Sequence, residues 1–291
     1  MNLIKPKNLK LADTIAIIAP AGEVQYDEIM KAKSFFENLG YKIILGKHLF
    51  DAERYLAGSD EERVEDLHNA FLNKDVNAIL CARGGYGCLR LLKYIDFDLI
   101  RNNPKIFCGY SDITVLSLML LKRSGLITFS GPMAQSDFNN EVPEISTQKS
   151  FFNVLKGCSE EYPSTEVVKF GEAEGIVWGG NLSSIVSLCG IDFIPEEDFI
   201  FFTEDVNEPA YKIDKMLTQL CNMKQFRQHV KGIAFGEFTD CDNEVWLREI
   251  FKETAELLDV PAYSGFKFSH SSKKQTVPVG IKGYLDGNLT I

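Results

Sequence analysis

The sequence predicts an α/β protein of two domains: an N-terminal, mostly parallel βαβ domain and a smaller, strand-rich C-terminal α/β domain. Three observations support this prediction. Strand-like and helix-like segments alternate through the first half, which is typical of right-handed βαβ units. The pattern decays between about residues 138 and 173, where polar residues and prolines replace it. The length of 291 residues also fits two domains of about 150 residues each.

Local signals place the elements of the first half in order. Thr14–Ala19 is an apolar strand, and Tyr26–Leu39 has apolar residues at helical spacing and stops at Gly40. Ser59 and Glu62 have the spacing of a capping box, which starts a helix that continues to about residue 73. The remaining expected elements are strands at Lys42–Leu45, Ala78–Ala82 and Lys105–Gly109, and helices over 87–94 and 112–122.

The break in the pattern sets the domain boundaries. We expect an N-terminal domain over residues 1–140, a connection over 141–173 and a C-terminal domain over 174–291. The closing segment predicts a hairpin, because Asp286-Gly287 is a two-residue type I′ turn signal between two short strands. The other elements expected in the C-terminal domain are strands at 199–203 and 232–235 and helices at 210–222 and 244–258.

Composition and charge exclude several classes of protein. The net charge of −10 opposes binding to a nucleic-acid backbone, because such binding depends on Lys and Arg. No apolar run approaches the roughly 20 residues that a membrane-spanning helix needs. The seven cysteines are widely spaced without a C-x-x-C pair, which suits a reducing compartment and argues against disulfides and a zinc site. We therefore expect a cytoplasmic protein that binds neither nucleic acid nor membrane.

Ser111 lies where an expected strand gives way, through Gly109-Tyr110, to an expected helix. A serine hydroxyl projects from the sheet at such a junction, and the next N–H, that of Asp112, lies free at the start of the helix. This is the arrangement of a nucleophile elbow with half an oxyanion hole. Ile113 stands where the second glycine of G-x-S-x-G would be, so the spacing departs from that motif. The alternative is that Ser111 only caps the helix.

The segment Arg83-Gly84-Gly85-Tyr86-Gly87 follows another expected strand. Glycines there allow backbone N–H groups to approach a ligand, and successive N–H groups form an anion-binding concavity. No Lys-Ser/Thr pair follows, so the segment is not a P-loop. A glycine turn without chemical function is the alternative.

His270 is the best-placed general base among the four histidines, because its loop follows an apolar strand. Glu204 ends another apolar strand, where a carboxylate can orient an imidazole; the alternative is acidity that favours the start of the following helix. No cysteine or histidine cluster has the spacing of metal ligands, so we expect no metal and no cofactor. The other histidines have the surroundings of solvated surface residues: His48, His68 and His229.

Together these segments resemble the LD-carboxypeptidase family of serine peptidases, which also contains the microcin C self-immunity peptidases. The resemblance extends from Ile15 to Gly283, and five motifs in the right order are far more specific than any one of them. The motifs are Arg83–Gly87, Gly109–Thr114, Trp178–Leu182, Phe202–Val206 with Glu208 and Tyr211–Lys215, and Gly265–His270.

The resemblance implies a role for each matched residue. Ser111 matches the nucleophile of the family, His270 its base, and Glu204 the carboxylate that orients the base. It also implies a homodimer, no metal, and a murein tetrapeptide as the usual substrate. The family releases the terminal D-alanine of that peptide from the L-centre of a diamino acid.

The resemblance further implies an oxyanion hole and a site for the free carboxylate of the substrate. The N–H of Asp112 and one N–H from Gly84 or Gly85 match the oxyanion hole. A carboxylate calls for a bidentate arginine or a backbone concavity. The candidate substrate contacts are Arg83, Tyr86 and Trp178.

Two alternatives remain open at this point. The chain could be a self-immunity peptidase that cleaves peptidyl nucleotides, and Trp178 is available to form an aromatic slot for a nucleobase. The segment Gly179-Gly-Asn-Leu182 favours the carboxypeptidase branch instead. The chain could also be a small-molecule binding module that holds an anion at Arg83–Gly87, with Ser111 as a helix cap.

Overall fold

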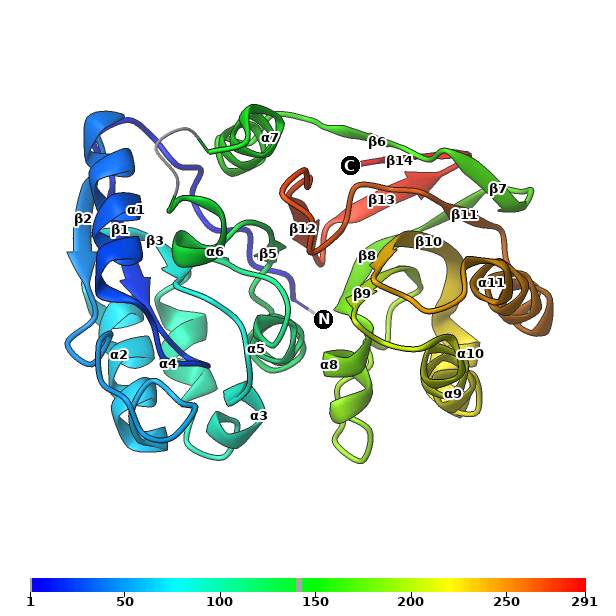
Figure 1. Cartoon of the computed structure of the whole chain (residues 1–291), viewed down its shortest axis with the longest axis horizontal. Coiled ribbons are helices and arrows are strands. Elements are labelled where there is room, and N and C mark those ends of the chain that lie inside the picture. Colours follow the sequence, from blue (N-terminus) through cyan, green and yellow to red (C-terminus); the bar gives the residue numbers. More distant parts are fainter. Residues whose placement is uncertain (1, 140–142) are drawn as a thin grey trace.

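The computed structural model describes residues 2–139 and 143–291 and contains two sheets side by side (Figure 1). The strands of the first sheet are β1 (Thr14–Ile18), β2 (Lys42–Leu45), β3 (Val76–Cys81), β4 (Ile106–Cys108), β5 (Thr128–Ser130) and β12 (Val277–Val279). They lie in the order β12-β5-β4-β3-β1-β2, and all pairs are parallel except β12 with β5. The predicted mostly parallel βαβ arrangement is therefore confirmed.

Helices cover both faces of the first sheet. They are α1 (Tyr26–Asn38), α2 (Asp60–Leu72), α3 (Cys88–Leu91), α4 (Phe97–Asn102), α5 (Ile113–Ser124), α6 (Ala134–Asp137) and α7 (Ile145–Leu155). Successive side chains of a strand point to opposite faces. Ile15 and Ile17 of β1 accordingly pack in the core that includes α1 and α7, whereas Ala16 and Ile18 pack in the core that includes α2 and α5.

The second sheet is larger and mixed. Its strands are β6 (Glu161–Pro163), β7 (Glu166–Lys169), β8 (Ala173–Asn181), β9 (Phe199–Val206), β10 (Val230–Thr239), β11 (Ala262–Ser264), β13 (Lys282–Leu285) and β14 (Asn288–Thr290). They lie in the order β6-β14-β13-β8-β9-β10-β11-β7, in which β8 to β11 are parallel and the outer pairs antiparallel. Its helices are α8 (Leu182–Ser187), α9 (Ala210–Cys221), α10 (Lys224–His229) and α11 (Glu244–Leu258).

Local signals were accurate where they were strong. The capping box forms, since Glu62 N donates to Ser59 Oγ and Ser59 N donates to Glu62 Oε2. Helix α11 has the predicted bounds, and so does β2. The closing hairpin is present, but its predicted type I′ turn is wrong. The loop spans three residues between Leu285 and Leu289, and within it a positive φ occurs at Gly287 and not at Asp286.

For two segments, the position in the chain does not indicate which sheet they join. The connection over 141–173 contains α7, β6 and β7, and its two strands form the two edges of the second sheet. Strand β12, which follows the second sheet's parallel strands, crosses back and pairs with β5 of the first sheet. The chain therefore connects the two sheets twice, once through the segment that contains α7, β6 and β7 and once through β12.

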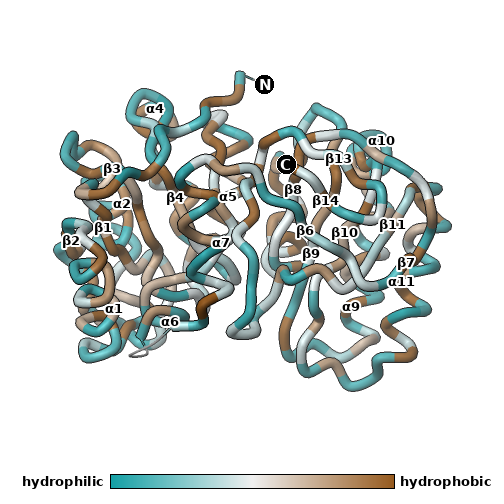
Figure 2. Tube along the Cα trace, turned by 90° about the horizontal axis from the view of Figure 1, so that it is seen from above, coloured by the Kyte–Doolittle hydropathy of each residue, from teal (hydrophilic) through white to brown (hydrophobic). Residues whose placement is uncertain are grey.

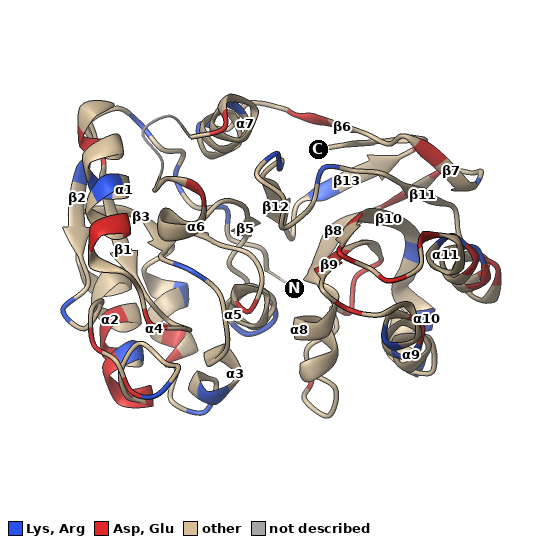
Figure 3. Cartoon of the chain, in the orientation of Figure 1, with Lys and Arg blue, Asp and Glu red and all other residues tan. Residues whose placement is uncertain are grey.

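Helix α5 lies between the two sheets and is apolar on nearly every side. Ten of its twelve residues are buried, and it packs against β8 and α8, so one hydrophobic core extends from the first sheet into the second. Figure 2 shows the hydrophobic residues concentrated on the inner strands and on α5. Figure 3 shows acidic and basic residues on outer helices such as α1, α2 and α11, and also on the edge strands β6 and β7. In the described chain, no helix combines the length and apolar character needed to cross a bilayer.

Candidate active site

Ser111 lies in the tight turn between β4 and α5. Its φ of +62° is left-handed, a conformation that a residue with a Cβ rarely adopts unless the surrounding structure imposes it. Gly109 permits the turn, because a Cβ there would lie 2.9 Å from Ile113 Cγ2 and 3.0 Å from Cys81 Cβ. Helix α5 begins at Ile113 with Asp112 at its N-cap position. The alternative in which Ser111 is the helix cap is therefore wrong.

The glycine-rich loop after β3 lies against this turn. A Cβ on Gly84 would be 2.7 Å from Ser111 Cβ and 2.9 Å from Ser111 Oγ, whereas a Cβ on Gly85 would meet no atom closer than 3.5 Å. The backbone N–H groups of Gly84, Gly85 and Asp112 donate to no acceptor in the described part of the chain. Gly84 thus lies against the Ser111 hydroxyl and Asp112 is the next residue in the chain, so N–H donors without a partner in the described structure lie near the position where an oxyanion would develop.

Two buried side chains hold the loops of the first sheet together. The guanidinium of Arg63 donates from Nη1 to the carbonyl oxygens of Pro20, at 2.7 Å, and Gly87, at 3.1 Å. The carboxylate of Asp112 accepts a 2.8 Å hydrogen bond from Cys88 N, and burial raises the pKa of this carboxyl. Sequence reasoning missed Arg63, because a single arginine in a polar helix gives no sign that it points inward.

His270 and Glu204 come together near the carboxyl end of β9, a central strand of the second sheet. Glu204 lies on β9, where it pairs with Asn181, and its residue is 4% exposed. His270 lies in the loop between β11 and β12, and its Nδ1 is 2.6 Å from Glu204 Oε2. The other nitrogen, Nε2, remains for a second partner.

Tyr110 joins the imidazole to the nucleophile turn. The rings of Tyr110 and His270 meet edge to face, with centroids 4.9 Å apart, and Ser111 is the next residue in the chain. Ser111 and His270 share no hydrogen bond in the described structure. In free enzymes such a bond commonly tightens only when substrate binds. The structure thus brings the three predicted residues to one place.

A buried polar network supports this junction. Asn181 N donates to Thr114 Oγ1 of α5 at 3.1 Å, and Asn181 Nδ2 donates to Asp205 Oδ1 at 2.9 Å. Gly180 has a φ of +144°, and a Cβ there would lie 2.7 Å from Thr114. Burial raises the pKa of the Asp205 carboxyl. Three of the sequence motifs therefore meet directly, one from the first sheet and two from the second.

Trp178 does not lie in this site. Its indole has no exposed surface and packs among phenylalanines, with ring centroids 4.9 Å from Phe199 and 5.8 Å from Phe193. An indole in the hydrophobic core cannot reach a ligand, so the prediction that Trp178 contacts substrate is wrong. The apolar residues that neighbour Trp178 along β8 and lie on β9 were the sequence signal that could have indicated its burial.

Arg83 and Tyr86 keep surfaces toward the outside of the glycine-rich loop. Arg83 is half-buried, and its Nη1 donates to the carbonyl oxygen of Glu23 at 3.1 Å. The Tyr86 ring is 45% exposed and lies 5.8 Å from that of Tyr55. Both side chains are accessible beside Gly84 and Gly85.

Among the described residues, the three that could together hold a metal ion are His48, Asp51 and Glu62. They lie after β2 and at the start of α2 and include no member of the Ser111 site. His48 Nδ1 is already 2.7 Å from Asp51 Oδ2, and this hydrogen bond raises the pKa of His48. Glu62 serves the capping box. The His48 side chain is 12% exposed and pairs with half-exposed carboxylates, so it lies at the surface but is less solvated than predicted.

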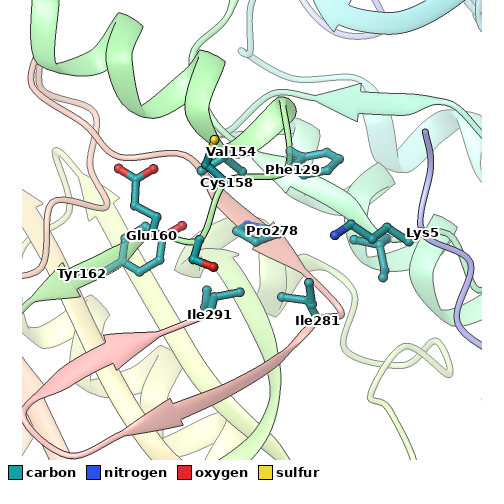
Figure 4. A pocket seen from close by; sticks show the side chains of 12 residues that line it. Lys5, Phe129, Val154, Cys158, Glu160, Tyr162, Pro278, Ile281 and Ile291 are labelled. Atoms are coloured by element: carbon teal, nitrogen blue, oxygen red, sulfur yellow. The ribbon is translucent and has the colours of Figure 1, made fainter. Parts of the chain in front are cut away.

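A pocket lies between the two sheets near β5, β12 and the C-terminal strand (Figure 4). Its wall is mostly apolar, with Lys5 and Glu160 at opposite sides. Burial raises the pKa of Glu160. Neither the Ser111 turn nor the glycine-rich loop lines this pocket, so it is separate from the site described above.

Known proteins and family models match this chain over most of its length. The family model of the LD-carboxypeptidase N-terminal domain matches residues 15–131, and that of the LD-carboxypeptidase C-terminal domain matches residues 174–285. A probable murein peptide carboxypeptidase of Bacillus subtilis (strain 168) is 38% identical over 293 residues, which cover 97% of this chain and 91% of the relative.

A further relative and a solved structure agree with these matches. The murein tetrapeptide carboxypeptidase of Pseudomonas aeruginosa is 33% identical over 288 residues, covering 94% of this chain and 93% of the relative. The crystal structure of an MccF-like protein from Bacillus anthracis str. Ames has a TM-score of 0.91 and 30% identity, covering 99% of each chain.

Proposed function

The chain belongs to the LD-carboxypeptidase family, and on that premise we propose that it releases the terminal D-alanine of murein tetrapeptides with a Ser111–His270–Glu204 triad. One observation carries the proposal: the Glu204-bound imidazole of His270 packs on Tyr110, directly before the left-handed Ser111. The names of the murein peptide relatives support the substrate. The reaction would serve cell-wall recycling.

The proposed reaction is amide hydrolysis through an acyl-enzyme. His270 Nε2 takes the Ser111 Oγ proton as Oγ attacks the scissile carbonyl carbon. Glu204 fixes the tautomer with the proton on Nδ1 and balances the imidazolium charge. The tetrahedral intermediate then collapses with cleavage of the C–N bond, and His270 gives its proton to the leaving nitrogen of D-alanine. Water deacylates Ser111 by the same steps, with His270 as base and then acid.

Backbone and arginine groups hold the charges of the substrate in this proposal. The N–H of Asp112 and an N–H of the Gly84–Gly85 pair bind the oxyanion, since these donors are free beside Ser111. Arg83 binds the terminal carboxylate of the peptide, because among the described residues its guanidinium is engaged only through Nη1. Tyr86 lines the rim beside it.

We expect Gly84→Ala to lower kcat by about 100-fold, because the new Cβ would displace the nucleophile and a misplacement of about 1 Å can cost that much. The Cβ would lie 2.7 Å from Ser111 Cβ. Steady-state kinetics with the tetrapeptide measure the loss. Gly190→Ala is the control for an added methyl group that meets no atom within 4 Å; its φ of +104° favours glycine, so kcat is compared per folded molecule. Equal activities of the two variants would contradict the close approach of Gly84 to the nucleophile.

Mass spectrometry of murein tri-, tetra- and pentapeptides incubated with the protein tests the function directly. We expect loss of one alanine from the tetrapeptide and no change in the other two. Ser111→Ala protein is the control for contaminating peptidases. Cleavage of the D-Ala–D-Ala bond of the pentapeptide, with the tetrapeptide intact, would overturn the assignment.

A peptidyl-nucleotide substrate is the second candidate, and similarity to the MccF-like structure favours it. The burial of Trp178 removes the aromatic slot that the sequence left available for a nucleobase. Parallel incubation with a peptidyl adenylate analogue separates the two candidates, because only the second predicts release of the nucleotide. Family membership leaves no support for the non-catalytic binding module.

The compartment and the assembly belong to the same proposal. The seven cysteines are free thiols, and free thiols suit the reducing cytoplasm, where recycled murein peptides would be processed. A homodimer is the assembly that the family resemblance implies. No sequence feature points to a nucleic-acid or membrane partner, given the net charge of −10.

A further inference from the structure

We propose that Lys274 is a positioning residue for the catalytic base, and that its buried ion pair with Asp137 locks the His270 loop onto the first sheet. The inference rests on the proposed function, since it concerns the placement of His270 over Ser111. Lys274 Nζ pairs with Asp137 Oδ1 at the end of α6, although the two residues are 137 positions apart. Their side chains are 3% and 5% exposed.

The ammonium group also contacts the ring that joins base and nucleophile. Lys274 Nζ lies 4.0 Å from the centroid of Tyr110, and the same ring meets the His270 imidazole. Carboxylate, ammonium, phenol ring and imidazole thus form a continuous series of contacts from α6 to the base. A shift of Lys274 would move the Tyr110 ring, and with it the surface on which His270 rests.

The loop has backbone anchors on the same side. Lys274 N donates to Thr147 Oγ1 of α7 at 3.0 Å, and Thr147 Oγ1 donates to Ser272 O at 2.6 Å. Figure 1 shows the loop before β12 reaching toward α6 and α7. Asp137 is itself held, because its Oδ2 accepts a 2.8 Å hydrogen bond from Met133 N. Lys274 is therefore held by Thr147, and Asp137 by Met133 N.

Burial of two charges argues for a role in geometry. Desolvation of a buried ion pair offsets much of its Coulomb attraction, so such a pair adds little stability compared with apolar residues of similar size. It does impose one arrangement, because any other leaves a charge buried and unpaired. Lys274 would accordingly specify where the loop docks, and the site would need that docking for His270 to face Ser111.

The test compares Lys274→Met with the double variant Lys274→Met/Asp137→Leu, which removes both charges. We expect Lys274→Met to lower the Tm and to lower kcat per folded molecule by about 10- to 100-fold, with KM within about twofold of wild type. The double variant should regain the Tm without regaining kcat. The matched control is Lys267→Met on the same loop, whose pair with Glu237 is half-exposed. It should keep wild-type kcat.

The rate of Ser111 acylation by a fluorophosphonate probe gives a second readout that needs no peptide substrate. We expect acylation of both Lys274 variants to slow in proportion to kcat. The inference would be overturned if Lys274→Met kept the wild-type kcat and acylation rate, or if the double variant recovered both. Either result would show that the pair has a purely structural role. Rapid acylation of wild type without cleavage of the tetrapeptide would overturn the proposed substrate alone, and the acylation rates would still decide the role of Lys274.

Discussion

Ser111→Ala and His270→Ala are each expected to lower kcat on the tetrapeptide by roughly 10⁴- to 10⁶-fold, and the double variant should be scarcely worse. Members of a catalytic unit are strongly non-additive, because losing either the hydroxyl or the base abolishes the same nucleophile. Single-turnover kinetics with the two single variants and the double variant measure this. Any residual rate would come from the oxyanion hole and from binding.

Thermal denaturation separates this prediction from a structural role of the same residues. Ser111 is partly exposed and the His270 side chain is 16% exposed, so their removal should leave the Tm near that of wild type. A loss of both activity and thermal stability would indicate that these residues support the fold. Losses that multiply in the double variant, or a tenth of wild-type turnover in Ser111→Ala, would mean that the two residues do not form a unit.

Glu204→Gln should lower kcat by about 10³- to 10⁴-fold, by comparison with a serine-protease carboxamide variant. The amide keeps the shape of the side chain but carries no charge to balance the imidazolium. Its NH₂ group can also donate to Nδ1, which would place the imidazole proton on Nε2, the wrong tautomer for a base. The pH dependence of kcat and the Tm are measured together.

Asp205→Asn is the matched control for this variant. Asp205 is the adjacent carboxylate on β9, and it bonds Asn181 and Ser183 N instead of the imidazole. The Asp205→Asn variant should lower mainly the Tm and leave kcat near that of wild type, because one buried acceptor oxygen would be replaced by an NH₂ group. If Glu204→Gln keeps a kcat within tenfold of wild type, Glu204 is not the orienting carboxylate.

Elements with strong local signals could be predicted from the sequence, and those that depend on distant pairing could not. The capping box of α2 and the apolar spacing of α11 are local, and both helices lie where predicted. Strands β6 and β7 are three and four residues long, and each pairs with a strand far along the chain, β6 with β14 and β7 with β11. Nothing in a short polar segment indicates which distant edge it will join.

The site divides in the same way. Ser111, Glu204 and His270 could be selected because each follows an apolar strand, where parallel sheets expose functional side chains. The inward direction of Arg63 and the burial of Trp178 depend on tertiary packing, which position in a helix or strand does not determine. Lys274 could not be selected for another reason: its partner Asp137 lies 137 positions away in the chain, and a lone lysine in a polar loop suggests solvent.

Strand β12 constrains the order in which the protein is completed as it leaves the ribosome. Strands β1 to β4 are close in sequence and can pair early, but β5 keeps an open edge until Val277 arrives to pair with Ser130. An open strand edge readily recruits other chains during synthesis. His270 precedes β12 by only a few residues, so the segment that closes this edge also supplies the proposed general base. A nascent chain would therefore remain catalytically silent, and would gain hydrolytic activity only when its first sheet is sealed.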